Sequence, residues 1–593
     1  MAFGSQDVEQ FELTRRLTPL LLLFIAGLSV VAARILYLQV GMGESLRKKS
    51  QKNRIEHDVL PAKRGIIVDR NGEVLAADEP VYNLRRRGNR RSITRSILKK
   101  LAEGLEIDFK TLRHRVFEDE SRIIVNGMTD SQKIWFAEHS GEFDAFEIQI
   151  RPRRVYRYGT IAAPVLGYTG EINPRELDKR RAEGLSQGKY VGKTGIEKYY
   201  DSTLQGEDGI RWVETTANGE AIRVLDSPTP ISPDPGDSIA LHLDIRLQRA
   251  VAKSFPSDSE GAVVVMEIPS GKVRALYSHP NYNPNDVVAG DKQLINELMK
   301  AKEDPFHNRV IQSRFPPGST FKILPFMVAS ADTGYSTSNE FYCNGEHKLG
   351  NQTYKCWKEE GHGSVTLNQS LIHSCNIYYY NLVEEMGFNP IKQFAETVGF
   401  SRKTNIDLPG EVKPQLSTPS LKASQTTRPW TEGDALNAVI GQGYTLISPI
   451  KQAQLLGSLL TDRWIIPGVK KGAAGTLNST FPPSDPTVDH LVTVMDDVTD
   501  EGTGYWAQHD ENYQRIGVDI IGKTGTVQKV KVDDDGDTPP SDAWFVSAAP
   551  KEDPSYVVSV FLAESGSGGS TAAPHARGIY RSMIELGFFN DDR

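Results

Sequence analysis

An uncharged hydrophobic run lies close to the start of the chain. It extends from Leu17 to Ala33, and residues 35–40 continue it beyond the charge of Arg34. This is about the length that an α-helix needs to cross a bilayer. A small residue such as Ala33 would also suit the cleavage site of a signal peptide. A hydrophobic run that continues beyond that site favours a retained membrane anchor over residues 17–40.

Short hydrophobic runs bounded by turn residues predict strands in the C-terminal half. They cover residues 261–266, 271–276, 519–526, 543–548 and 556–562. The first two would form a hairpin, and the last two would lie beside the strand at 519–526. A helix near residues 573–586 would close the resulting sheet.

The length of the chain and a proline-rich passage predict more than one soluble unit. With 593 residues the chain is too long for a single compact domain. Residues 227–235 contain four prolines and mark a plausible boundary. We therefore expect one domain over residues 41–235 and another over residues 236–593.

Three short motifs in the second domain carry side chains suited to acyl transfer by a serine. In chain order they are Ser319-Thr320-Phe321-Lys322, Ser374-Cys375-Asn376 and Lys523-Thr524-Gly525-Thr526. None is specific alone, because Ser-x-x-Lys also begins at Ser45, Ser96 and Ser448, and Lys-Thr-Gly also begins at Lys193. Only Ser319 follows a turn-forming Phe-Pro-Pro-Gly segment and precedes a hydrophobic run, as the first turn of a buried helix would.

This placement of Ser319 suits a nucleophile. Its hydroxyl needs an adjacent base, and a helix N-terminus favours developing negative charge. Lys322 would lie on the same helix face and is the expected base. It accepts a proton only when neutral, so burial and a nearby cation such as Lys523 must lower its pKa.

The other two motifs offer contacts for a substrate. Ser374 carries a hydroxyl that can relay protons, and Asn376 carries an amide that can hold a substrate amide. The third motif is typical of a strand in which Gly525 lets a substrate backbone come close. The hydroxyls of Thr524 and Thr526 can bind a terminal carboxylate.

These motifs, in this order, resemble those of the penicillin-binding proteins and serine β-lactamases. The resemblance implies an α+β transpeptidase domain with a five-stranded antiparallel sheet flanked by helices. It makes Ser319 the acylated nucleophile, Lys322 its base and Ser374 the proton shuttle. It also implies that Asn376 contacts a substrate amide and that the backbone N–H groups of Ser319 and Thr526 form the oxyanion hole. The substrate and its terminal carboxylate would be bound by the third motif, Lys523, Thr524, Gly525 and Thr526.

The N-terminal half resembles the pedestal of the class B penicillin-binding proteins. The stretches that carry this resemblance are residues 64–72, 167–172 and 192–200, and the last contains the second Lys-Thr-Gly. It implies a non-catalytic, dimerisation-like pedestal over residues 41–235 and a transpeptidase domain over residues 236–593. Because no long segment remains for a glycosyltransferase domain, a monofunctional transpeptidase is expected.

All three cysteines, Cys343, Cys356 and Cys375, lie in one window with His362. Three sulfurs and one imidazole form the ligand set of a closed tetrahedral zinc site. The spacing is not that of a standard zinc finger, so a Cys343–Cys356 disulfide and free thiols remain alternatives. Residues 356–363 resemble the segment before the second motif in elongation-type class B enzymes, which implies a structural zinc ion and no cofactor for catalysis.

Taken together, the resemblance implies a peptidoglycan D,D-transpeptidase of cell-wall elongation. Residues 17–40 would cross the bacterial inner membrane once, with residues 1–16 as a short cytoplasmic tail and the catalytic domain in the periplasm. The implied partners are stem peptides, β-lactams that acylate Ser319, and a SEDS-family glycan polymerase that is RodA-like. A formal net charge of −7 argues against nucleic acid.

Three alternatives remain open. A division-type transpeptidase would share every catalytic residue. A β-lactamase would need a water-activating residue, and none can be identified in the sequence. A non-enzymatic β-lactam receptor would carry several spans and a cytoplasmic signalling domain.

Overall fold

The structure is a computed structural model. It describes residues 5–44, 55–87, 93–118, 123–185, 187–215, 221–225, 227, 229–331, 335–477, 481, 485–528 and 541–590. The chain forms two compact units. The first unit comprises Met1–Ala62, Pro80–Arg151 and Glu207–Asp234, and the second comprises Lys63–Glu79, Pro152–Gly206 and Pro235–Arg593.

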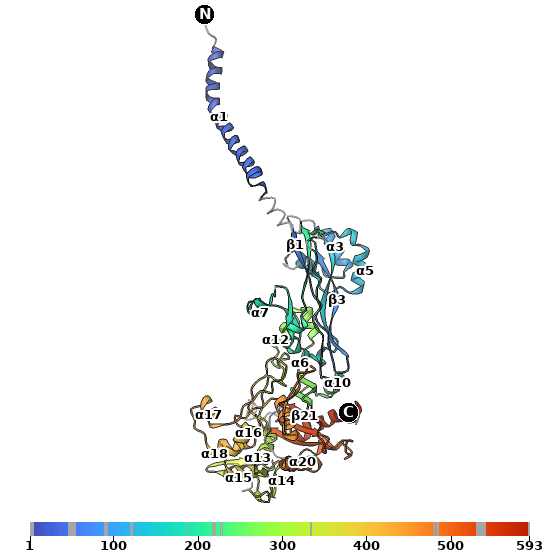
Figure 1. Cartoon of the computed structure of the whole chain (residues 1–593), viewed down its shortest axis with the longest axis vertical. Coiled ribbons are helices and arrows are strands. Elements are labelled where there is room, and N and C mark those ends of the chain that lie inside the picture. The colour runs from blue at the N-terminus through green and yellow to red at the C-terminus, as the bar shows by residue number, and fades with distance from the viewer. Residues whose placement is uncertain are drawn as a thin grey trace. The chain divides into compact units, whose positions relative to one another are not determined.

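The hydrophobic run near the N-terminus forms a helix, α1 (Ser5–Leu36), which continues into a π-helical turn, η1 (Tyr37–Gly41) (Figure 1). Residues Pro19–Gly41 are long and apolar enough to cross a membrane, with a mean hydropathy of 2.3 and no part buried against the protein. A helix of this length whose apolar side chains find no protein partner is consistent with a single membrane anchor.

The rest of the first unit combines two sheet regions with three capped helices. Strands β1 (Ile55–Leu60), β8 (Gly209–Thr215) and β9 (Ala221–Val224) form an antiparallel sheet. The end of β3 (Val74–Arg86) pairs with β4 (Ile123–Val125), and β5 (Phe146–Tyr156) also pairs with β3. Helices α3 (Arg95–Gly104), α4 (Phe109–Phe117) and α5 (Asp130–Glu138) begin at the side-chain caps Thr94, Asp108 and Thr129. Their buried Leu98, Leu112 and Phe136 share one small core.

The second unit contains a section with short elements around a buried ion network. Strand β10 (Ile239–Ala240) pairs with β2 (Ile67–Val68), and β6 (Thr169–Glu171) pairs with β7 (Tyr190–Gly192). Four short helices lie in the same section: α6 (Ala163–Leu166), α7 (Pro174–Arg180), α8 (Gly195–Tyr199) and α9 (Asp201–Leu204). Glu197 is fully buried and accepts hydrogen bonds from Arg64 at 2.6 Å and Arg154 at 2.7 Å.

A five-stranded antiparallel sheet forms the centre of the second unit. Its order is β12 (Val273–His279), β11 (Gly261–Glu267), β21 (Tyr556–Leu562), β20 (Asp542–Ala549) and β19 (Ile521–Val527). Val263, Phe545 and Val560 pack with helices α10 (Ile245–Ser254) and α22 (Ala573–Glu585) in one core. Neighbouring positions such as Val264 and Trp544 belong to a second core with helices α13 (Ile323–Ala331), α19 (Pro449–Thr461) and α20 (Asp485–Asp500). Because both faces are covered, the strands are nearly continuous hydrophobic runs.

The remaining elements of the second unit surround this sheet. The helices are α11 (Pro284–Ala289), α12 (Lys292–Lys300), α14 (Leu367–Ile372), α15 (Asn376–Met386), α16 (Asn389–Thr397), α17 (Pro419–Gln425), α18 (Glu432–Val439) and α21 (Tyr505–Gln508). The short turns η6 (Gly318–Lys322) and η7 (Gly568–Ala572) flank β19. The remaining strands form antiparallel pairs: β13 (Phe341–Cys343) with β16 (Gly363–Val365), β14 (Glu346–Leu349) with β15 (Gln352–Lys355), and β17 (Trp464–Ile466) with β18 (Gly475–Leu477).

Candidate active site

Ser319 lies in a short turn that leads directly into a hydrophobic helix. This turn, η6, is a 3₁₀ turn that continues into α13. Gly318 before it has φ +54°, and its N–H donates to the carbonyl of Gly441 at 3.1 Å. Ser319 is half-buried, and its hydroxyl makes no hydrogen bond within the described part of the chain. The hydroxyl is therefore available to a substrate at the N-terminus of a buried helix.

Lys322 joins the first motif to the second. Its side chain is fully buried. Its ammonium Nζ donates to Asn376 Oδ1 at 2.7 Å, to the carbonyl of Ser374 at 2.8 Å and to the hydroxyl of Ser374 at 3.4 Å. The centre of the Tyr379 ring lies 5.3 Å from the same nitrogen. A proton on Lys322 can therefore pass directly to the Ser374 hydroxyl.

Burial changes the acidity of both lysines in the site. Desolvation lowers the pKa of Lys322 to about 8, although the three cysteine sulfurs nearby act in the opposite direction. Lys523 is also fully buried, and desolvation followed by the charge of Lys322 holds its pKa well below its usual value. The site thus favours a neutral lysine close to neutral pH, as general-base catalysis requires.

Ser374 has a strained backbone. Its φ is +54°, in the left-handed region that few side chains other than glycine adopt. The bond from Lys322 to its carbonyl and the bond from the Cys375 N–H to the Ser370 carbonyl, at 3.0 Å, fix the chain on either side. Surrounding contacts therefore determine where the Ser374 hydroxyl points.

The third motif lies on β19, beside the turn that carries Ser319. The Nζ of Lys523 donates to the carbonyl of Thr524 at 3.1 Å, and the hydroxyl of Thr526 accepts from the N–H of Gly568 at 3.1 Å. A Cβ on Gly525 would lie 2.8 Å from the carbonyl oxygen of Pro317 and 3.1 Å from Cβ of Trp544. Only glycine lets β19 approach η6 this closely, a second reason for this residue besides substrate access.

Two contacts of the site were not predicted from the sequence. The hydroxyls of Thr503 and Thr524 are 2.7 Å apart. The carbonyl of Gly441 accepts the hydrogen bond from Gly318, and there is no room for a side chain at this position. A Cβ on Gly441 would lie 2.3 Å from the carbonyl oxygen of Gly318. Gly502-Thr503-Gly504 has the form of a turn, but nothing in its sequence connects it to Thr524.

The four predicted metal-ligand residues lie together. One ligand atom from each of Cys343, Cys356, His362 and Cys375 lies within 4.8 Å of all the others. The sulfurs of Cys343 and Cys356 are 3.5 and 3.6 Å from Nδ1 of His362. Sulfur and nitrogen ligands of a tetrahedral zinc ion lie roughly 3.6 Å apart, from bond lengths of about 2.3 and 2.1 Å. The donor set fits zinc, and the cysteines form no disulfide in this structure.

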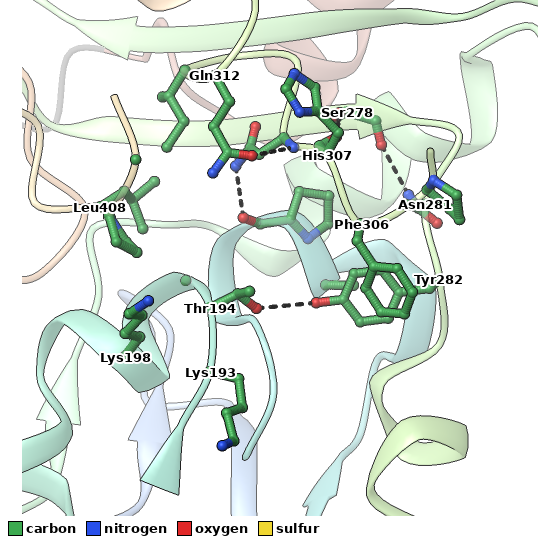
Figure 2. A pocket seen from close by; sticks show the side chains of 18 residues that line it. Lys193, Thr194, Lys198, Ser278, Asn281, Tyr282, Phe306, His307, Gln312 and Leu408 are labelled. Atoms are coloured by element: carbon green, nitrogen blue, oxygen red, sulfur yellow. Dashed lines mark hydrogen bonds between the residues drawn. The ribbon is translucent and has the colours of Figure 1, made fainter. Parts of the chain in front are cut away.

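The second Lys-Thr-Gly motif lies apart from this site. Lys193, Thr194 and Gly195 line a cavity of about 120 Å³ that includes none of the predicted catalytic residues (Figure 2). The Thr194 hydroxyl lies 3.3 Å from that of Tyr282, and Lys193 is paired with Glu176 at 2.5 Å. These side chains stabilise the fold around α8, so the repeated motif does not duplicate the candidate active site.

Comparisons with known proteins agree with this geometry. Residues 261–581 match the family of the penicillin binding protein transpeptidase domain, and residues 59–241 match that of the penicillin-binding protein dimerisation domain. The chain is 29% identical to the peptidoglycan D,D-transpeptidase MrdA of Haemophilus influenzae, over 97% of this chain and 92% of that protein. It is 28% identical to the stage V sporulation protein D of Bacillus subtilis, over 98% of this chain and 87% of that protein.

Solved structures of similar fold include a penicillin-binding protein, PBP2, from Helicobacter pylori. Its TM-score is 0.76 at 24% identity, and the match covers 90% of this chain and 100% of that one. The same protein is known in complex with MreC, with the same TM-score and 99% of that chain covered. A chain of a peptidoglycan synthase complex has a TM-score of 0.70 at 25% identity and covers 96% of this chain and 98% of that one.

Proposed function

The chain belongs to the penicillin-binding protein transpeptidase family, and on that premise we propose how its residues carry out acyl transfer. It is a class B, PBP2-like protein with a dimerisation domain and a transpeptidase domain. Its activity is that of an elongation-type peptidoglycan D,D-transpeptidase, which works through an acyl-serine intermediate. The observation that carries the assignment of roles is the set of hydrogen bonds from Lys322 to Ser374 and Asn376.

In the first half-reaction the hydroxyl of Ser319 attacks the penultimate D-alanine carbonyl of a stem peptide. Neutral Lys322 accepts the hydroxyl proton, and its lowered pKa makes this possible near neutral pH. The proton then passes through the Ser374 hydroxyl to the nitrogen of the departing D-alanine, as the C–N bond breaks and the ester forms. In the second half an amine of a neighbouring stem attacks the ester, and Ser319 regains its proton.

Strand β19 would hold the substrate beside the serine. It is the edge strand of the central sheet, so its outer backbone groups are available to an extended peptide. Lys523 and the hydroxyls of Thr524 and Thr526 would bind the terminal carboxylate, and Asn376 an amide of the stem. The N–H groups of Ser319 and Thr526 would stabilise the oxyanion, a term of about 3–4 kcal/mol per donor in well-measured enzymes. A β-lactam would acylate Ser319 through the same contacts.

The Cys343, Cys356, His362 and Cys375 cluster would hold a structural zinc ion. The ion would offset most of the charge of the three thiolates and cross-link the chain around Cys343, residues 356–362 and Cys375, and it would take no part in the acyl transfer. Because Cys375 lies between Ser374 and Asn376, its position determines how these two side chains meet Lys322. No cofactor is needed for the reaction itself.

We assign residues 17–40 as a single anchor in the inner membrane, residues 1–16 as a cytoplasmic tail, residues 41–235 as a periplasmic pedestal and residues 236–593 as the periplasmic transpeptidase domain. A SEDS-family, RodA-like glycan polymerase is the proposed membrane partner. The similarity to MrdA proteins, and to a protein solved in a peptidoglycan synthase complex, supports this assignment. Depleting the protein from cells tests the alternative of a division-type transpeptidase. Rounded cells would support an elongation role, and filamentous cells would support a division role.

Labelling with fluorescent penicillin tests the assignment of the nucleophile. The Ser319→Ala variant should lose all labelling. Ser448→Ala is the matched control, because Ser448 also begins a Ser-x-x-Lys sequence and is fully buried. This control should label like the wild type, and continued labelling of Ser319→Ala would overturn the assignment. A penicilloyl adduct that hydrolyses within seconds would point to a β-lactamase instead.

A further inference from the structure

A second cavity in the same unit has a charge opposite to that of the whole chain. It has a volume of about 690 Å³ and lies at the β12 edge of the central sheet. This volume is in the range of small-molecule sites, about 300–1,000 Å³. Five cationic side chains line it: Arg70, Arg246, Lys272, Arg274 and Arg463. We call it the basic cavity.

Nearby carboxylates only partly neutralise these cations. Glu267, which lines the cavity, accepts hydrogen bonds from Lys272 at 3.0 Å and from Nε of Arg274 at 2.9 Å. Asp244 lies 2.7 Å from Arg246 and 3.9 Å from Arg70. The side chain of Arg463 is exposed and has no carboxylate partner among the residues that the structure describes. Asp69, a buried carboxylate whose charge also acts on Arg246, is the third, so the basic cavity keeps an excess of two positive charges on a chain whose net charge is −7.

A buried histidine contacts one of the cations that line the cavity. His242 is 8% exposed, and its carbonyl accepts a hydrogen bond from Arg274. Desolvation, followed by the charges of Arg274, Lys272 and Lys471, lowers its pKa to about 4. Burial is the main reason that His242 stays neutral, and the charges of Arg274 and Lys272 act in the same direction.

The distribution of the cations over the chain favours an anion with several acceptor oxygens. The cations come from four separate segments: the turn before β3, the first turn of α10, strand β12 with the residue before it, and the loop before β17. The guanidinium of Arg70 lies 5.4 Å from the ring centre of Phe588, which holds it in place at the cavity wall. An anion held among these segments can contact more than one cation, and a phosphate group offers more acceptor oxygens for this than a carboxylate, which has two.

We propose that the basic cavity is a binding site for a phosphate-bearing ligand, contacted by Arg70, Arg246 and Arg463. Strands β12 and β19 are the opposite edges of the five-stranded sheet. Four strand spacings of about 4.8 Å separate them by roughly 19 Å. The ligand therefore does not compete with the substrate of Ser319, and the site does not depend on the roles proposed for the three motifs.

Calorimetric titration of the full chain in nanodiscs tests the proposal, with inorganic pyrophosphate as the probe. Pyrophosphate should bind, and Arg463→Gln and Arg70→Gln should each weaken its binding about tenfold or more. Arg428→Gln is the matched control, since Arg428 is an exposed arginine that does not line the cavity. Protein acylated beforehand with penicillin should bind pyrophosphate as tightly as free protein, and the variants should still label with penicillin.

Three results would overturn the proposal: no binding of pyrophosphate, equal binding of citrate, or equal affinity in Arg463→Gln and the wild type. Loss of binding after acylation would contradict the separation of the two sites. The lipid composition of the discs distinguishes two sources of the phosphate. Weaker pyrophosphate binding in discs that contain phosphatidylglycerol, compared with phosphatidylcholine alone, identifies a lipid headgroup as the occupant. Unchanged binding identifies a free phosphorylated molecule.

Discussion

The ammonium group of Lys322 lies 2.7 Å from the side-chain oxygen of Asn376, a residue 54 positions further along the chain. This bond and the contact with Ser374 bring the first two motifs together inside the protein. Lys322 is fully buried, and the loss of hydration destabilises its charged form.

The rate of acylation by penicillin should rise with pH and level off above about pH 8. Lys322 accepts a proton only in its neutral form, and burial lowers its pKa to about 8. Well below that pH the rate should fall about tenfold per unit, because the neutral fraction falls by that factor. Acylation rate constants between pH 6 and pH 9.5 measure this, and a flat profile would contradict Lys322 as the base. Lys322→Arg, which stays charged throughout, should be inactive at every pH.

Thr503→Val should slow acylation without unfolding the protein. The variant removes the 2.7 Å contact that orients the hydroxyl of Thr524. A hydrogen bond of this kind contributes about 1 kcal/mol, so we expect a roughly fivefold loss in kcat/KM. Thr503→Ser keeps the hydroxyl and should restore the rate. Thr493→Val, at an exposed threonine of α20, should have no effect on acylation; equal losses in Thr493→Val and Thr503→Val would show a non-specific effect.

Metal removal should lower thermal stability and acylation together. The purified protein should contain one zinc ion per chain by elemental analysis, held by Cys343, Cys356, His362 and Cys375. Cys375→Ser should lose the metal, unfold at a lower temperature and react more slowly with penicillin, because Ser374 and Asn376 lose their anchor. Purified protein with an oxidised Cys343–Cys356 pair and no metal would refute the zinc site.

Lys451 should make stability depend on pH. Its side chain is 2% exposed, its Nζ donates to Gln454 at 2.7 Å, and desolvation lowers its pKa to about 7. This pKa is below the pKa of a lysine side chain in the unfolded protein. Between about pH 7 and pH 10 the unfolded state therefore binds more protons than the folded state. The free energy of unfolding contributed by this group therefore rises with pH across that window.

Comparison with a Lys451→Met variant isolates this effect. Each pH unit between the two pKa values is worth about 1.4 kcal/mol. From pH 7 to pH 9 the wild type should gain roughly 2–3 kcal/mol relative to Lys451→Met, measured by chemical denaturation. Lys403→Met, at an exposed lysine, should show no such relative change. If the difference between wild type and Lys451→Met stays constant with pH, Lys451 is charged in the folded protein.

Much of the fold around the site follows from local patterns. The strand predicted at residues 556–562 has the bounds of β21, and the helix predicted at 573–586 differs from α22 by one residue. Strand β12 begins two residues later than predicted, at Val273, because Gly271 has φ +74° and belongs to the turn. The compact units also differ from a division at the proline-rich passage, since residues 63–79 and 152–206 belong to the second unit.

The sequence by itself determined which chemistry the protein can perform. Ser319 and Lys322 are three residues apart, and a serine, a base and a carboxylate-binding strand can be recognised because each requires particular residue types at short spacing. The tertiary structure alone decided how these parts meet: the bond from Lys322 to Asn376, the contact of Thr503 with Thr524, and the convergence of Arg70 and Arg463 on one cavity. Hydrophobic burial is not directional, so the sequence patterns that drive folding do not state which distant polar groups it brings within hydrogen-bonding distance.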